Sequence, residues 1–284
     1  MDMIEGEMDM IEGETGWNGR RIATTTLRGL AMLLRIAMAI AIGAVLLTGS
    51  ARAALVEGTN ENDLLFGADD DNQQNPVVQP TGASNQSLNN ADVMDGKGGD
   101  DVMIGLLGSD TMRGGKGNDV MIGGTEQATQ PNSDIMFGDD GRDVAIWRGG
   151  DGSDVFIGGR GVDALVMGTI DRDADNIPVI VPATGRYEET GLPTADVTGQ
   201  NGSCTLEDVR DQDLGYDFLV RFFVKSTGVL AVTMRVADVE QVFCTAETAA
   251  AITYADLRAP SPAFVEVSLE EVAELSGTVR KIIR

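Results

Sequence analysis

The stretch GKGGDDVMIGLLGSDTMRGGKGNDVMI, residues 96–122, consists of three consecutive blocks of nine residues that share one pattern. Each block begins with glycine, carries aspartate at its sixth position and has an apolar residue at its eighth. A fixed period shows that one structural unit was built repeatedly. The pattern predicts a glycine-shaped acidic turn joined to a very short strand. Acidic turns that stack on one another require a cation.

The same register extends in both directions along the chain. Its sixth positions are separated by 9, 20, 9, 9, 9, 15, 9, 11 and 9 residues. Two of the longer steps contain polar segments, residues 73–90 and 125–133, which are expected to be surface loops. The step of eleven residues contains Trp147 and Arg148 and predicts a local bulge. The residues at the sixth positions are Asp63, Asn72, Asp92, Asp101, Asp110, Asp119, Asp134, Asp143, Asp154 and Asp163.

Residues 58–166 resemble the RTX, or haemolysin-type, calcium-binding repeats, whose formula is Gly-Gly-x-Gly-x-Asp-x-U-x with an apolar residue at U. The blocks Gly114–Ile122 and Gly149–Ile157 match this formula at every defined position. The resemblance covers a little over a third of the chain. It implies a mainly β protein with a parallel β-roll, in which six residues form each turn, three form each strand and two nonapeptides complete one coil.

The resemblance also implies that the turns bind several calcium ions. Calcium takes six to eight oxygen ligands, which carboxylates and backbone carbonyls supply. Glycines at positions one, two and four allow positive φ, so that the turns can point their carbonyls inward without a Cβ clash. Turns two repeats apart should stack, which pairs Asp92 with Asp110, Asp101 with Asp119, Asp134 with Asp154 and Asp143 with Asp163. The residues expected to bind metal are Asp63, Asp92, Gly96, Gly98, Asp101, Gly105, Asp110, Gly115, Gly117, Asp119, Asp134, Gly141, Asp143, Gly150, Gly152, Asp154, Gly161 and Asp163.

The eighth positions are expected to point into the roll. Five of these nine residues are methionine, a flexible side chain that fills irregular gaps in a core, and this interpretation is preferred over a soft-metal or redox stripe. The nine are Leu65, Met94, Met103, Met112, Met121, Met136, Ala145, Phe156 and Leu165. Residues 54–166 hold 20 acidic and 6 basic side chains, a net charge of −14. Crowded carboxylates repel one another, so the roll is predicted to fold only when calcium binds.

Residues 167–284 carry no nonapeptide and are expected to form a small β-rich domain that caps the open end of the roll. Phe218–Val224 and Val229–Met234 read as a hairpin. Residues 236–243 are predicted to form another strand and 248–257 a short helix. A capping box from Ser268 to Glu271 predicts a C-terminal helix.

The first 53 residues are predicted to be a signal peptide with an extended n-region. Four arginines precede the apolar stretch 36–47, and Ala51-Arg-Ala53 is a small-x-small cleavage site that makes Ala54 the mature start. A retained signal anchor is the alternative. The only two cysteines, Cys204 and Cys244, are expected to form a disulfide in an oxidising compartment, with two buried free thiols as the alternative. The expected location is extracellular, with the periplasm or the cell surface as alternatives.

Charge and composition narrow the function classes. A net charge of −24 argues against nucleic acid or an anionic membrane surface as partner, and no stable membrane span is expected after signal cleavage. The chain has no histidine, which excludes His-based zinc sites and Ser-His-Asp or Cys-His catalysis. The sequence therefore predicts a non-enzymatic, exported calcium-binding protein with a structural or adhesive role. Its expected partners are calcium ions and an extracellular or cell-surface protein or polysaccharide. The alternative is a secreted enzyme with an unrecognised catalytic site in residues 167–284.

Overall fold

The computed structural model describes residues 55–67, 91–106, 108–124, 133–170, 180–181, 191–199, 201–246, 251–275 and 277–283. The predicted signal peptide, Asn72 and almost all of both predicted loops lie outside these ranges. Residues 49–284 form one compact unit. Within the described part of the chain, no helix has the length and hydropathy needed to cross a bilayer.

Two eight-stranded sheets, one on each side of a shared core, account for most of this unit. The first sheet has the strand order β1 (Leu55–Glu57), β3 (Val93–Asp95), β5 (Thr111–Lys116), β7 (Ile135–Gly141), β9 (Val155–Gly161), β17 (Leu230–Ala237), β16 (Phe218–Val224) and β15 (Gly202–Asp208). The second sheet has the order β2 (Leu64–Phe66), β4 (Val102–Ile104), β6 (Val120–Ile122), β8 (Val144–Trp147), β10 (Ala164–Met167), β18 (Gln241–Thr245), β19 (Ile252–Asp256) and β20 (Val265–Val267).

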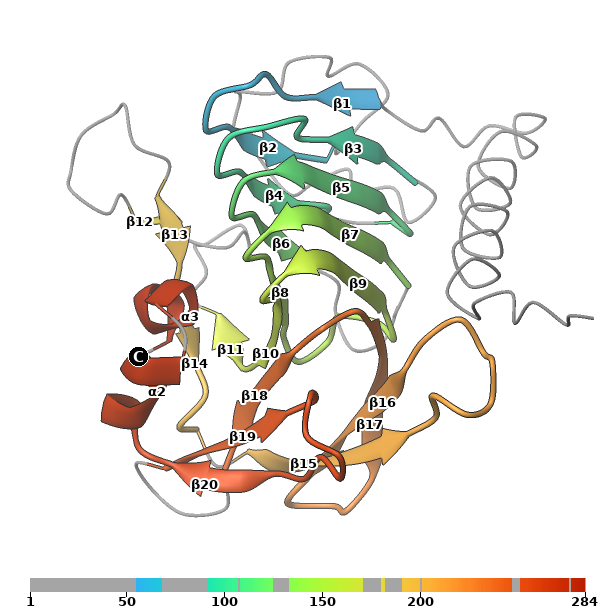
Figure 1. Ribbon diagram of the computed structural model, residues 1–284, viewed down its shortest axis with the longest axis vertical. Helices are drawn as coiled ribbons and strands as arrows, with labels where there is room; N and C mark the ends of the chain where they lie inside the picture. Colours follow the sequence, from blue (N-terminus) through green and yellow to red (C-terminus); the bar gives the residue numbers. More distant parts are fainter. Residues whose placement is uncertain are drawn as a thin grey trace, which may run out of the picture. The chain divides into compact units, whose positions relative to one another are not determined.

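The strands from β1 to β10 are parallel within each sheet and alternate between the two sheets, which confirms the predicted parallel β-roll (Figure 1). Val102 pairs with Val120 and Met103 with Met121, an offset of two nonapeptides for each coil. The longer steps do not disturb this pairing. Thr111 still pairs with Ile135 across the step of fifteen residues.

The inward eighth positions form the core between the sheets, as predicted. All nine of these side chains are no more than 1 % exposed. The second sheet is also buried on its outer face, where Val272 of α2 (Leu269–Leu275) and Val279 and Ile282 of α3 (Gly277–Ile282) belong to the covering cluster. The outer face of the first sheet is partly exposed, as at Val93, which is 42 % exposed. Within the described residues, α2 and α3 thus pack with the outer face of the second sheet, whereas the outer face of the first sheet is partly exposed.

The C-terminal segment extends both sheets of the roll. β17 pairs in parallel with β9, and β18 pairs in parallel with β10. The predicted hairpin is confirmed as the antiparallel pair of β16 and β17. Two short pairs complete the described strands, one formed by β11 (Thr169–Ile170) with β14 (Ala195–Asp196) and the other by β12 (Ile180–Val181) with β13 (Leu192–Pro193).

Two predictions for this segment are wrong. Residues 236–243 do not form one strand, because Asp238 turns at a φ of 50° and the chain passes from the first sheet to the second. Within 248–257, the segment Ile252–Asp256 is strand β19 rather than helix, because it pairs antiparallel with β18. The C-terminal helix is confirmed as α2 and α3, and the Ser268 hydroxyl donates to Glu271 Oε2 at 2.8 Å in the predicted capping box.

A disulfide joins Cys204 in the first sheet to Cys244 in the second, 40 residues apart in sequence. Replacing both cysteines with serine is expected to cost roughly 3–4 kcal/mol of the free energy of unfolding, because the crosslink restricts the unfolded chain. For a unit of this size the melting temperature should fall by roughly 10 °C. Thermal melts in calcium measure this fall in melting temperature. The reduced wild type is the control and should melt at the same temperature as the double serine variant. Alkylation of either thiol in the native, unreduced protein would contradict the bond.

Candidate metal centre

The sixth-position aspartates form two columns, one at each edge of the roll. We call Asp63, Asp101, Asp119, Asp143 and Asp163 the first ladder; they end the turns that lead from the first sheet to the second. We call Asp92, Asp110, Asp134 and Asp154 the second ladder; they end the turns that lead back. Of these nine side chains only Asp63 is less than fully buried.

Each ladder is built by one repeated hydrogen bond. The backbone N–H of an aspartate donates to Oδ1 of the aspartate one coil further on, at 2.8 Å from Asp101 to Asp119 and 2.9 Å from Asp143 to Asp163 in the first ladder. In the second ladder the distance is 2.7 Å from Asp92 to Asp110. The four predicted pairs are therefore stacked. The last of them, Asp134 to Asp154 at 2.9 Å, keeps the contact despite the eleven-residue step.

Several of the second carboxylate oxygens accept no hydrogen bond from the described residues. Among the described residues, five buried Oδ2 atoms accept no hydrogen bond, and they belong to Asp101, Asp119, Asp134, Asp143 and Asp163. A buried charge without a partner is costly, and such charges in proteins are usually paired or bound to a metal. These carboxylate oxygens are therefore suited to bind a cation.

At several turns, a carboxylate Oδ2 atom and a backbone carbonyl oxygen both lie beside the first glycine of the turn. A Cβ atom added to Gly96 would lie 2.4 Å from Asp101 Oδ2 and 2.6 Å from the carbonyl oxygen of Gly114 in the next coil. At Gly105 the corresponding distances are 2.4 Å to the carboxylate and 2.2 Å to the carbonyl, and at Gly138 both are 2.4 Å. Carboxylate and carbonyl oxygens are the donors that calcium prefers. We call this arrangement the glycine cradle.

The glycines serve two different needs. The first positions Gly96 and Gly105 do not adopt the positive φ that glycine allows, and their role is to leave space beside the carboxylate. Positive φ occurs at second and fourth positions, with 108° at Gly115 and 132° at Gly117. Lys97 occupies a second position at a φ of 71° despite its Cβ. The turn conformation is therefore strong enough to impose strain on a residue other than glycine.

The other predicted glycines are distributed over both edges. Gly161 and Gly150 have positive φ, Gly141 lies against the Gly117 carbonyl, and the Gly152 N–H donates to Asp151 Oδ1 at 3.1 Å. Gly98 has no close neighbour, since a Cβ there would meet nothing nearer than 3.6 Å. The assignment of these glycines and of the ladder aspartates as metal ligands stays a prediction.

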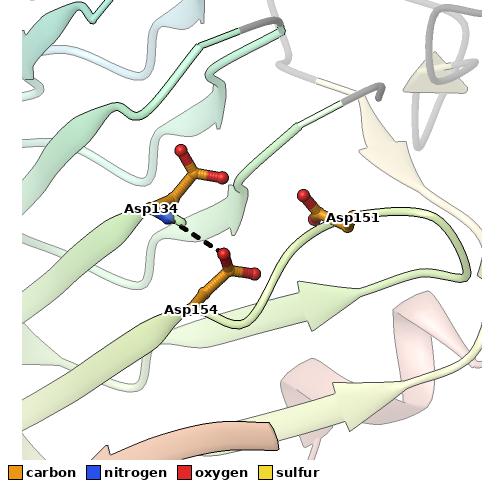
Figure 2. Close-up of side chains that lie close together, drawn as sticks. All are labelled: Asp134, Asp151 and Asp154. Atoms are coloured by element: carbon orange, nitrogen blue, oxygen red, sulfur yellow. Dashed lines mark hydrogen bonds between the residues drawn. The ribbon is translucent and has the colours of Figure 1, made fainter. Parts of the chain in front are cut away.

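Asp151 is a candidate ligand that the sequence analysis missed. Ligand oxygens of Asp134, Asp151 and Asp154 all lie within 4.8 Å of one another, and all three side chains are buried (Figure 2). The Asp151 Oδ2 atom also accepts the N–H of Gly124 at 3.3 Å. Asp151 stands at the third position of its nonapeptide, which the formula leaves undefined. The feature of the sequence that could have identified Asp151 is the irregular step of eleven residues from Asp143 to Asp154, within which Asp151 lies.

Burial shifts the titration of these aspartates strongly. It raises the pKa of Asp101, Asp119 and Asp163 to about 7 and that of Asp143 to about 8. Burial, followed by the charges of Asp151, Asp154 and Asp110, also raises the pKa of Asp134. Without a cation, the folded turns therefore favour protonated carboxyls near neutral pH. A cation removes this penalty by stabilising the ionised form.

These shifts predict how pH affects the protein in a chelator. The unfolded chain holds these carboxyls near their ordinary pKa of about 4. Between about pH 4 and pH 8 the folded roll then binds more protons than the unfolded chain, so its free energy of unfolding falls as pH rises. In the chelator we expect the roll to be more stable at pH 5, where it shows a melting transition, than at pH 8, where it is largely unfolded. In saturating calcium the order should reverse, since protons compete with the metal for the carboxylates.

Thermal melts followed by circular dichroism at both pH values, with and without calcium, measure this effect. The Asp143→Asn variant should show a weaker pH dependence in the chelator, because it lacks one of the shifted groups. Stability that rises with pH in the chelator would contradict the assignment.

Comparison with protein families locates the repeats independently. Residues 89–126 and 148–166 match the model of the RTX calcium-binding nonapeptide repeat, in four copies. No curated protein matches the chain. The match omits residues 127–147, yet Asp134 and Asp143 lie there and keep their places in the two ladders. The chain thus carries RTX calcium-binding nonapeptide repeats, and these repeats build a parallel β-roll.

Proposed function

We propose that this chain is an exported protein whose roll folds on binding several calcium ions and then serves a structural or adhesive role outside the cell. The observation that carries the proposal is the set of five buried Oδ2 atoms without hydrogen-bond partners among the described residues. A fold that buries so many bare carboxylate oxygens at neutral pH depends on a cation to neutralise them.

The small size of each coil supports the dependence on calcium. Each coil contributes one strand to each sheet, as β3 and β4 do with three residues each, and so buries only a few apolar side chains. Apolar burial stabilises by about 25 cal/mol per Å², so short strands offset little carboxylate repulsion. Calcium binding supplies the missing free energy, and its binding free energy then appears as folding free energy.

An extracellular location is supported by three features. The disulfide between Cys204 and Cys244 is stable in oxidising compartments and rare in the cytosol. RTX repeats are typical of exported proteins, and the N-terminal charge pattern is that of a signal peptide. A structural or adhesive role needs a rigid folded surface rather than reactive groups, and we assign no catalytic residue.

Cell fractionation tests the location, and a calcium-dependent pull-down tests the role. The full-length chain should yield a mature form beginning at Ala54 outside the cytoplasm, as determined by mass spectrometry. In calcium it should retain a protein or polysaccharide from the culture medium or the cell surface, and a chelator should release that partner. The Asp110→Ala/Asp119→Ala double variant should retain none. A cytoplasmic, uncleaved protein would contradict the proposal.

A further inference from the structure

The turn between β17 and β18 repeats the geometry of the roll without containing a nonapeptide. β17 lies on β9 with Val236 opposite Phe156, and β18 lies on β10 with Val242 opposite Leu165. Ala237 pairs with Ile157 and Gln241 with Ala164, so the three residues 238–240 span the distance that the six residues 158–163 span in the preceding coil. The C-terminal segment thus adds a further half-coil to the roll.

Glu240 takes the position that aspartate holds in the first ladder. The Asp163 N–H donates to Glu240 Oε2 at 2.7 Å, where the preceding step has the Asp143 N–H donating to Asp163 Oδ1 at 2.9 Å. The glutamate side chain is longer by one methylene and reaches the ladder from a shorter turn. The hydrogen-bond pattern of the first ladder therefore continues one step beyond the last nonapeptide.

The glycine cradle is also present at this junction. A Cβ on Gly158 would lie 2.7 Å from Asp163 Oδ2 and 2.3 Å from the carbonyl oxygen of Asp238. In the preceding coil the Gly138 cradle has the same pair of donors, with Gly158 supplying the carbonyl. Asp238, at a φ of 50°, places its carbonyl where a nonapeptide would place that of its first glycine.

A second observation points to a ligand here. Asp163 is 0 % exposed, its Oδ1 accepts the Asp143 N–H, and its Oδ2 accepts no hydrogen bond from the described residues. Asp217, whose Oδ2 accepts the Asp238 N–H at 3.2 Å, adds negative charge nearby. The cation that acts on Glu240 is Arg258, which is held by Asp256 through two hydrogen bonds of 2.8 Å.

We propose that a calcium ion binds at this junction, held by Asp163 Oδ2, the Asp238 carbonyl oxygen and the Glu240 carboxylate, with water completing its coordination. The site rests on the proposed calcium-dependent function, but two of its three ligands lie outside the repeats. An ion bound there connects the last coil to β17 and β18. Calcium then orders the C-terminal segment as well as the roll, and the two unfold together.

Counting bound calcium in the Glu240→Gln variant tests the proposal. Glutamine keeps the length of the side chain and an acceptor for the Asp163 N–H but removes the charge. Equilibrium dialysis with radioactive calcium should find one ion fewer than in the wild type, or one step weakened at least ten-fold. The control is Glu270→Gln, which removes an exposed glutamate of α2 and should bind the full number of ions.

The outcomes separate this site from the function on which it rests. Wild type and Glu270→Gln binding no calcium would contradict the proposed function itself. Glu240→Gln binding every ion with unchanged affinity would overturn the junction site alone. If Glu240→Gln does not fold in calcium, a wild-type crystal grown in calcium decides the matter. A cation peak between the Asp163 and Glu240 carboxylates supports the site, and a clear map without one overturns it.

Discussion

Removal of calcium with a chelator at pH 8 is expected to unfold the roll together with the C-terminal segment and to abolish most of the β signal in circular dichroism. At this pH the ladder aspartates whose pKa is raised to about 7 are ionised, and each holds a buried oxygen without a hydrogen-bond partner among the described residues. Their mutual repulsion acts on coils that bury little apolar surface. Calcium titrated back should restore the signal cooperatively, since each ion bridges neighbouring turns.

Hydrogen exchange tests calcium-dependent folding at individual residues. Amides of β4, β6, β8 and β10, which lie in a sheet buried on both faces, should exchange fast in the chelator and slowly in calcium. Magnesium at the same concentration is the control, because it prefers octahedral coordination and gives up its water reluctantly. A full β signal in the chelator, or equal recovery with magnesium, would contradict calcium-dependent folding.

The regular part of the site can be predicted from the sequence, because the position of a residue in the nonapeptide determines its location in the roll. Residues that share a position in the nonapeptide share a place in the turn, so Asp101 and Asp119 stack because eighteen residues make one coil. The eighth-position core follows from the same rule. Loops inserted within turns do not change it, and Asp110 reaches Asp134 across a 24-residue step at 2.7 Å.

The irregular part of the site has no such rule. Asp151 occupies an undefined position and joins the second ladder only through the conformation of an unusual turn. Glu240 lies 77 residues from Asp163, and only the pairing of β17 on β9 and β18 on β10 brings them together. The same pairing explains why residues 236–243 do not form the single strand that the sequence predicts. Their apolar pattern is that of a strand, and the break at Asp238 comes from tertiary contacts.

Replacing Gly96 with alanine is expected to be the most damaging single substitution in the first ladder. The new Cβ would lie 2.4 Å from Asp101 Oδ2 and 2.6 Å from the Gly114 carbonyl oxygen, closer than real Cβ atoms approach. The carbonyl belongs to a paired backbone and cannot move away cheaply. Overpacking alone costs about 1–3 kcal/mol, and the methyl group also fills the space beside the two oxygens expected to bind calcium. The calcium concentration at the midpoint of folding should rise at least ten-fold.

Gly98→Ala is the matched control, because Gly98 lies in the same turn only two residues away. A Cβ there would meet nothing nearer than Asn60 Oδ1 and the Lys116 carbonyl oxygen, both at 3.6 Å, and its φ is not positive. Alanine should therefore leave the calcium midpoint unchanged or stabilise the roll by up to about 1 kcal/mol, since it reduces the freedom of the unfolded chain. Both variants keep every backbone carbonyl and every aspartate, so they differ only in what the methyl group touches. Equal midpoints for the two would contradict a calcium ion in the glycine cradle, whereas a shift confined to Gly96→Ala is the result expected for an ion beside Asp101 Oδ2.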